Sequence, residues 1–180
     1  MTGNEFFRRL KALGKARGIP VLRDALRGKG SHEKAFDMNQ FEYAVKLSPS
    51  DEGGFVVTCR DLPQLITQGD DLPHAIAEAT DAMDEVFATY MKTGFVFPQP
   101  SKARRSEHLV SPPADTVAKA ALYVAMTEAG ISNVELARRL GIDEKAVRRL
   151  LDPHYGSKLP RIAQAIAALD RRLVIGLQAV

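Results

Sequence analysis

The chain has 180 residues, of which 45% are hydrophobic and 26% are charged, and its net charge is +3. This length suffices for one large or two small domains, and the composition is that of an ordinary soluble protein. No apolar run approaches the roughly 20 residues that span a bilayer, and the amphipathic start of the chain does not resemble a signal-peptide core. The single cysteine, Cys59, excludes an intrachain disulfide and fits the cytoplasm, where we expect the protein to be located.

The small net charge conceals three segments of different sign. Residues 1–37 carry nine Lys or Arg against four Asp or Glu, residues 38–98 carry three against ten, and residues 99–180 carry thirteen against eight. Basic segments favour contacts with polyanions, whereas an acidic segment avoids nucleic acid and suits a basic protein partner. Chance variation of surface charge is the alternative explanation.

The N-terminal segment is too small to fold alone. Residues 4–17 predict a basic amphipathic helix, and residues 19–26 predict one strand. The sequence RGKGSHEK follows at 27–34. One helix and one or two strands bury too little surface for stability, so we expect this segment to dock elsewhere, to swap or to remain partly disordered.

Residues 38–97 predict a small α+β domain. Hydrophobic residues alternate with polar or small ones over 41–47 and again over 55–59, and residues 65–67 offer a short third strand. Three strands and one helix leave one face of the sheet uncovered. Such a face invites a partner or self-association.

The helix of this domain is predicted from its caps and its periodicity. Asp71 is suited to cap its first turn, and Gly94 is suited to end it. Its expected apolar side consists of Leu72, Ile76, Ala79, Met83, Val86, Phe87 and Tyr90.

A linker and a helical domain are expected next. Prolines bracket a polar stretch at 98–113, which is the composition of a linker. Within 114–180, helical spacing predicts one helix at 116–129, with Val117, Ala121, Val124 and Ala125 on its face, and another at 159–169. The apolar residues 173–177 predict a closing strand.

Between those two helices, the sequence predicts a helix-turn-helix reader of DNA. Ser132 can cap a short helix that Gly141 ends, and Asp143 can cap a second helix that Asp152-Pro153 stops. The expected buried positions are Leu136, Ala137, Leu140, Ile142, Ala146, Val147 and Leu150. Outside the second helix remain charged side chains that can reach bases and phosphates from the major groove, namely Glu144, Lys145, Arg148 and Arg149. The alternative is a solvated face of an ordinary helical pair.

Residues 38–180 resemble the HicB antitoxins over their entire length. The resemblance is carried by Gly-Gly-Phe at 53–55, Asp-Leu-Pro at 61–63, Thr-Gln-Gly-Asp at 67–70 and the helix-turn-helix sequence. It implies an α+β fold in which a small, degraded ribonuclease-H-like domain without catalytic residues is joined by a Pro-rich linker to an all-α Cro/repressor-like domain. It also implies an antitoxin that binds and neutralises an mRNA-cleaving HicA toxin and represses its own operon.

Residues 1–34 look like the start of a HicA toxin. Gly30-Ser31-His32 matches the toxin's Gly-Ser-His loop, so the resemblance makes His32 a vestigial catalytic candidate. The later strands and closing helix of a HicA do not follow. We therefore expect residues 1–37 to be a truncated toxin fragment and the protein not to be an enzyme.

The expected site residues divide by partner. For operator DNA, Lys145 and Arg148 should read bases, while Arg149 and Lys158 should contact phosphates. For the toxin, the candidates are Asp61, Asp70 and Asp71, which lie at predicted strand and helix ends. We expect at least a homodimer, formed through residues 173–177, and no membrane contact.

No cofactor and no metal are expected, because the four histidines are scattered and Cys59 has no neighbouring cysteine. Two alternatives stay open. One is a fused toxin–antitoxin with residual RNase activity at His32, and the other is a one-component transcription regulator whose α+β domain senses a ligand.

Overall fold

The computed structural model describes residues 41–176. The predicted helix at 4–17, the predicted strand at 19–26 and the Gly30-Ser31-His32 motif therefore lie outside the described residues. So do residues 38–40, with which the α+β domain was expected to begin.

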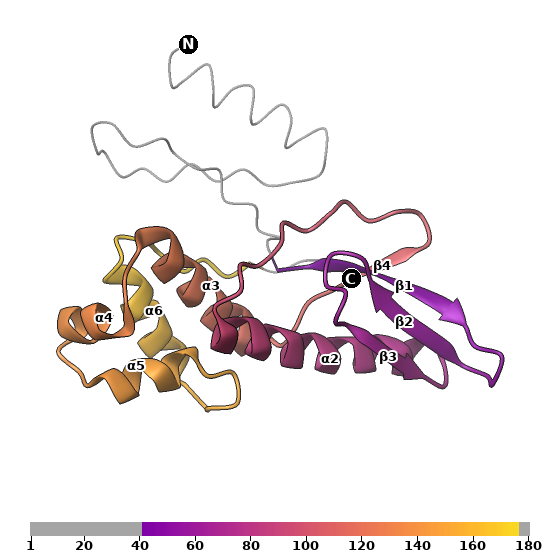
Figure 1. The fold of residues 1–180 in the computed structure, drawn as a ribbon, viewed down its shortest axis with the longest axis horizontal. Coiled ribbons are helices and arrows are strands. Elements are labelled where there is room, and N and C mark those ends of the chain that lie inside the picture. The colour runs from indigo at the N-terminus through magenta and orange to yellow at the C-terminus, as the bar shows by residue number, and fades with distance from the viewer. Residues whose placement is uncertain (1–40, 177–180) are drawn as a thin grey trace, which may run out of the picture. The chain divides into compact units, whose positions relative to one another are not determined.

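Four antiparallel strands form one sheet in the order β3-β2-β1-β4 (Figure 1). The strands are β1 (Tyr43–Pro49), β2 (Phe55–Cys59), β3 (Ile66–Gly69) and β4 (Glu107–Val110). The turn between β1 and β2 contains Gly53 and Gly54, whose φ angles of 95° and 72° favour glycine. In the resulting register, Val45 lies opposite Cys59 and Thr58 lies opposite Ile66. β1 and β2 were predicted from their alternating patterns, and β3 was predicted as a short strand at 65–67.

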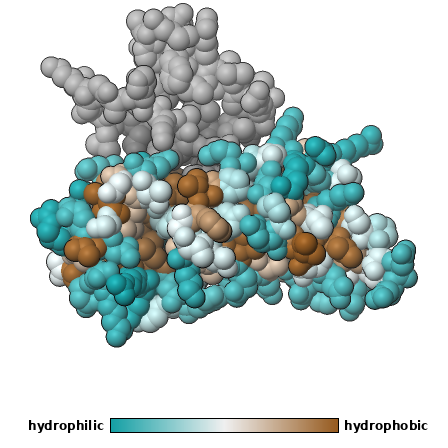
Figure 2. Space-filling model, viewed as in Figure 1, coloured by the Kyte–Doolittle hydropathy of each residue, from teal (hydrophilic) through white to brown (hydrophobic). Residues whose placement is uncertain are grey.

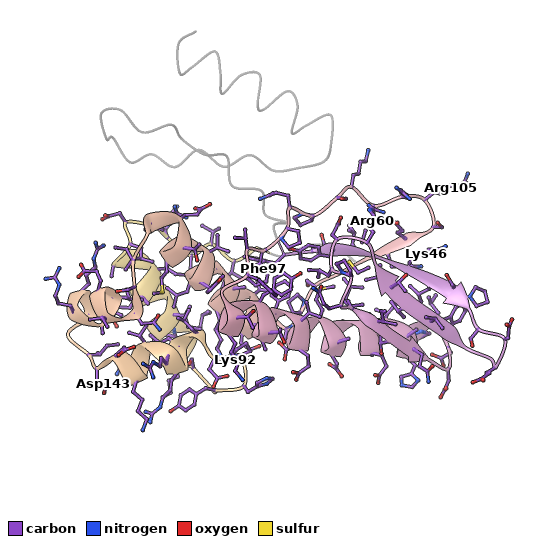
Figure 3. All side chains as sticks on the ribbon, viewed as in Figure 1. Lys46, Arg60, Lys92, Phe97, Arg105 and Asp143 are labelled. Atoms are coloured by element: carbon purple, nitrogen blue, oxygen red, sulfur yellow. The ribbon has the colours of Figure 1, made fainter. Side chains whose placement is uncertain are left out.

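The segment at 98–113, predicted as a linker, carries the fourth strand, so the expectation of three strands was wrong. β4 pairs with β1, and the loop before it is held to the sheet (Figures 1 and 3). The backbone amide and hydroxyl of Ser101 donate to the Asp61 carboxylate at 2.8 and 2.6 Å. Arg60 donates to the carbonyl of Lys102 at 2.7 Å and to the Glu107 carboxylate. Proline and polar side chains thus form an ordered loop here, because the sheet supplies hydrogen-bond partners that are distant in sequence.

Helix α2 (Leu72–Thr93) packs against this sheet. Asp71 caps it and Gly94 ends it in the left-handed conformation, as predicted. Its buried residues are Ala75, Ala79, Met83, Val86, Phe87 and Tyr90. Leu72, expected on this side, is exposed, whereas Ala75, about one turn later, is buried where Gly69 lies against its backbone.

Four further helices follow within the described residues: α3 (Ala114–Ala129), α4 (Asn133–Leu140), α5 (Glu144–Leu151) and α6 (Leu159–Ala167). Together with the sheet and α2 they make a mixed α+β fold. The described residues 41–176 belong to one compact unit, although their hydrophobic residues fall into two clusters. The division into domains at 97 and 114 stays a prediction.

Helix α3 belongs to both clusters. Val117, Ala121 and Val124 pack against the core between sheet and α2, as does Ala120. Ala118, Leu122, Ala125 and Met126 lie in the core of the helical group. The predicted apolar face thus combines residues of both cores, since Ala125 lies in the second core and Val117 and Val124 pack against the first. The prediction of a single face was wrong because α3 lies between the two cores.

The closing strand expected at 173–177 is wrong for the residues described. Residues 171–176 contain neither helix nor strand, and the side chains of Val174 and Ile175 are exposed. A strand needs a neighbouring backbone to pair with, and none of the described strands pairs with this segment. In the described part of the chain, no helix is both long and apolar enough to cross a membrane.

Candidate functional site

Helices α4 and α5 form the helix-turn-helix arrangement that the sequence predicts. The Ser132 hydroxyl accepts a hydrogen bond from the amide of Glu135 at 3.2 Å, and the Asp143 carboxylate accepts one from the amide of Ala146 at 2.7 Å. Gly141, between the helices, has a φ of 64°. Both caps and the glycine turn are confirmed, and they fix where each helix begins and where the first one ends.

The inner sides of the two helices pack into a common core. Leu136, Ala137, Val147 and Leu150 are buried, together with Ile162 of α6. Leu140, Ile142 and Ala146, also expected in this core, are only partly buried. The small side chain of Ala137 permits close approach of the helices. This packing determines which side of α5 faces solvent.

The outer side of α5 carries three exposed cations, Lys145, Arg148 and Arg149. Glu144, half-buried, accepts a hydrogen bond from Nη2 of Arg148 at 2.7 Å. An exposed pair of this kind contributes about 0–1 kcal/mol, so a phosphate or a base can replace the carboxylate. Figure 3 labels Asp143 at the start of α5, and Figure 2 shows hydrophilic residues over this part of the surface.

A segment after α5 extends this surface, and sequence reasoning missed most of it. The Tyr155 ring is exposed and lies 5.4 Å from the guanidinium carbon of Arg149. The Ser157 hydroxyl donates to the carbonyl of Arg149 at 3.2 Å, and the exposed Lys158 precedes α6. The signal in the sequence that could have indicated this extension was an aromatic residue, Tyr155, in the polar segment that follows the second helix. The structure thus brings all five predicted DNA-binding residues onto α5 and the segment that follows it.

A second charged surface lies along α2. We name as the acidic stripe the residues Asp70, Asp71, Glu78, Asp81 and Glu85, which are exposed or half-buried. His74 lies within it, with Nδ1 3.6 Å from Asp70 and Nε2 3.4 Å from Glu78. Sequence reasoning named only Asp70 and Asp71, although spacings of three and four residues from Glu78 to Glu85 were a readable signal.

The third predicted toxin-binding residue differs from the other two. Both carboxylate oxygens of Asp61 accept hydrogen bonds from Ser101, and they hold the loop before β4. The Asp70 side chain is fully exposed apart from its contact with His74, whereas Asp71 uses one oxygen to cap α2. The structure therefore places two of the three candidates together and gives Asp61 an internal role.

No metal-binding arrangement is found in the described residues: no group of three or more His, Cys, Asp or Glu side chains there could hold an ion. Cys59 is buried, and burial raises the pKa of its thiol. The vestigial candidate His32 lies outside the described residues.

Comparison with known proteins identifies a matching family and several similar proteins. Residues 42–121 match the family described as "HicB_like antitoxin of bacterial toxin-antitoxin system". The chain is 32% identical to "Antitoxin HicB" of Escherichia coli (strain K12) over 131 residues, which are 73% of this chain and 95% of that protein. It is 32% identical to "Antitoxin HicB" of Pseudomonas fluorescens (strain Pf0-1) over 140 residues, 77% of this chain and 95% of that protein. It is also 35% identical to "Antitoxin HicB 2" of Photorhabdus laumondii over 131 residues, 73% of this chain and 92% of that protein.

Proposed function

This chain belongs to the HicB-like antitoxins of bacterial toxin–antitoxin systems. We propose that it neutralises an mRNA-cleaving HicA-type toxin by direct binding and that it represses its own operon through α4 and α5. The observation that carries the proposal is an acidic stripe combined with a cationic helix-turn-helix in a chain of this family. The proposed role is binding without catalysis, in the cytoplasm. We also propose a finer fold assignment. The sheet with α2 is a degraded ribonuclease-H-like domain, and the helical group is Cro/repressor-like.

We propose that the toxin docks on α2 and the sheet, with the acidic stripe facing its basic surface. Charge complementarity mainly accelerates association, so the association rate should fall as salt rises. A variant combining Glu78→Gln, Asp81→Asn and Glu85→Gln should associate more slowly and show a weaker salt dependence. Asp51→Asn, at an exposed position in the turn between β1 and β2, is the matched control. A salt-independent association rate for the unmodified chain would contradict this picture.

For DNA, we propose that α5 enters the major groove. Lys145 and Arg148 read bases, Glu144 releases Arg148 on contact, and Arg149 and Lys158 bind phosphates. Arg148→Ala should cost about 1–3 kcal/mol and relax sequence preference, whereas Lys158→Ala should weaken binding to all sequences and reduce the salt slope by about 1. If both variants bound the operator like the unmodified chain in a gel-shift titration, the assignment would be wrong.

One helix-turn-helix reads half of a site. We therefore propose that at least a dimer binds an inverted repeat with half-sites roughly 34 Å apart or a multiple of that spacing. The exposed apolar side chains of Val174 and Ile175 support the end of the chain as the contact between copies. Sedimentation of the free chain and of its complex with DNA measures the number of copies, and a monomer in both would contradict the proposal.

For residues 1–37, we propose a truncated toxin fragment without activity, supported by Gly30-Ser31-His32 alone. The fragment has a net charge opposite to that of residues 38–98, so it is suited to compete with free toxin for the acidic surface. Deletion of residues 1–37 should leave DNA binding intact and leave toxin affinity equal or improved. RNA cleavage by the full chain that is lost in a His32→Ala variant would contradict this interpretation.

A further inference from the structure

A lysine is completely buried beneath the end of α5. Lys119, on α3, has no exposed surface. Its Nζ donates to the carbonyl oxygens of Asp152 at 2.8 Å, Pro153 at 3.0 Å and Tyr155 at 2.6 Å. Carbonyl oxygens only accept, and an ammonium has three protons to donate, so this geometry uses the full donor capacity of a protonated lysine.

This arrangement replaces an ordinary helix ending. Helices α2, α3 and α4 each end at a glycine in the left-handed conformation, whereas α5 ends at Asp152, whose backbone is extended. The last carbonyls of a helix need donors and favour a nearby cation. From a different helix, Lys119 supplies donors and a positive charge to the carbonyl of the cap residue Asp152 and to the carbonyls of Pro153 and Tyr155 in the chain that leaves α5.

The cost of burying this cation indicates that its position matters. Lysine is almost never fully buried unless it is paired. Burial lowers the pKa of Lys119, and the carboxylates around it, that of Asp115 foremost, oppose this lowering. A solvated lysine on an Ala-rich helix would need none of these compensating contacts.

The segment that Lys119 holds is also the segment that supports the reading surface. Tyr155, whose carbonyl accepts the shortest of the three bonds, packs its ring against Arg149. Ser157 donates to the carbonyl of Arg149 from the same segment. Since α3 packs in both hydrophobic cores, its lysine ties the end of α5 to the most extensively packed helix of the helical group.

We propose that Lys119 is a positioning residue for sequence-specific DNA recognition: it fixes the end of α5 and residues 152–157 against α3, and so sets the orientation in which Lys145 and Arg148 meet the bases. It does not touch DNA itself. This inference rests on the DNA-binding part of the proposed function.

The test separates positioning from a general contribution to stability. The full-length chain first selects a duplex from a random DNA library, and dissociation constants are then measured for that duplex and for a shuffled duplex of the same composition. Lys119→Met keeps the length of the side chain and removes the donor. We expect about ten-fold weaker binding to the selected duplex, the scale of one lost base contact. Binding to the shuffled duplex should change less than about two-fold, because the phosphate-binding cations remain.

A matched control removes a lysine that lies elsewhere. Lys92→Met deletes one exposed cation near the end of α2, where Figure 3 labels it, and should leave the ratio of the two dissociation constants unchanged. Hydrogen exchange supplies a second measurement. The amides of residue 152 and of residues 154–157 should exchange faster in Lys119→Met than in the unmodified chain, while those of β1 and β2 should not.

If Lys119→Met fails to fold, the same measurements are made on Lys119→Gln, because the glutamine amide retains two hydrogen-bond donors on a slightly shorter side chain. We expect it to give an intermediate ratio. A folded variant that melts earlier but keeps the ratio of the unmodified chain would overturn the inference, since Lys119 would then only stabilise the fold. If the unmodified chain selects no sequence at all, the DNA-binding part of the proposed function fails, and this inference fails with it.

Discussion

Gly69→Ala should destabilise the fold through one close backbone contact. Gly69 ends β3, and α2 starts only three residues later. A Cβ at this position would lie 2.4 Å from the amide nitrogen of Ala75 and 2.5 Å from its Cα. Ordinary contacts begin near 3.4 Å, so the helix backbone would have to move by about 1 Å.

The size of the effect follows from what would have to move. The obstructing atoms are backbone atoms of α2 and have no alternative rotamer to adopt. Overpacking a filled contact costs about 1–3 kcal/mol, and we expect the upper part of this range. For a chain of this size, each kcal/mol lowers Tm by about 2–4 °C. The acidic stripe begins at Asp70, so toxin binding should also weaken.

Urea denaturation followed by circular dichroism measures this loss as a lower midpoint at unchanged slope. Gly156→Ala is the matched control, because a Cβ there meets nothing within 4 Å and the φ of Gly156 is not positive. Its free energy of unfolding should stay within about 0.5 kcal/mol of that of the unmodified chain. If both variants had the same midpoint, the close approach of β3 and α2 would not have the energetic role assigned to it.

Three further predictions concern α4 and the turn after it. Hydrogen bonds from Arg138 and then Arg139 lower the pKa of Glu135 from 4.5 to about 2, so the folded state favours its carboxylate. The resulting stability is present above about pH 4.5 and is lost as the pH falls towards 2. Over this interval the Tm of a Glu135→Gln variant should decline less than the Tm of the unmodified chain. If the two Tm values declined in parallel, the assignment would be contradicted. Gly141→Ala places a Cβ on a residue with a φ of 64° and should lower the free energy of unfolding in urea by about 1–2 kcal/mol. An unchanged free energy of unfolding would contradict this prediction. Leu136→Ala should cost about 2–5 kcal/mol, because the side chain is completely buried and leaves a cavity; a cost below about 1 kcal/mol would mean that this core is loosely packed.

The parts of the fold that were predicted correctly depend on interactions between residues that are close in the sequence. Asp71, Ser132 and Asp143 cap the helices at which they were expected, because the capping hydrogen bond spans only three residues. Gly94 and Gly141 adopt the left-handed conformation that ends a helix. Alternation over 55–59 likewise predicts β2 as it is found.

Features that depend on distant partners could not be predicted in this way. β4 has only four residues, and its identity as a strand comes from pairing with β1 some 60 residues earlier. Lys119 looks like a surface residue of an Ala-rich helix until the carbonyls after α5 are placed beside it. Asp61 was predicted as a partner-binding residue, and only the folded loop reveals its hydrogen bonds to Ser101.

The most direct test of the antitoxin proposal is RNA cleavage by a HicA-type toxin from the same genome, measured while the full-length chain is titrated in. We predict complete inhibition near a stoichiometric ratio, with a toxin–antitoxin complex that elutes as one species from a sizing column. The variant carrying Glu78→Gln, Asp81→Asn and Glu85→Gln should require more protein for the same inhibition, whereas Asp51→Asn should not. Undiminished cleavage in an excess of the chain, with toxin and chain eluting separately, would contradict the proposal.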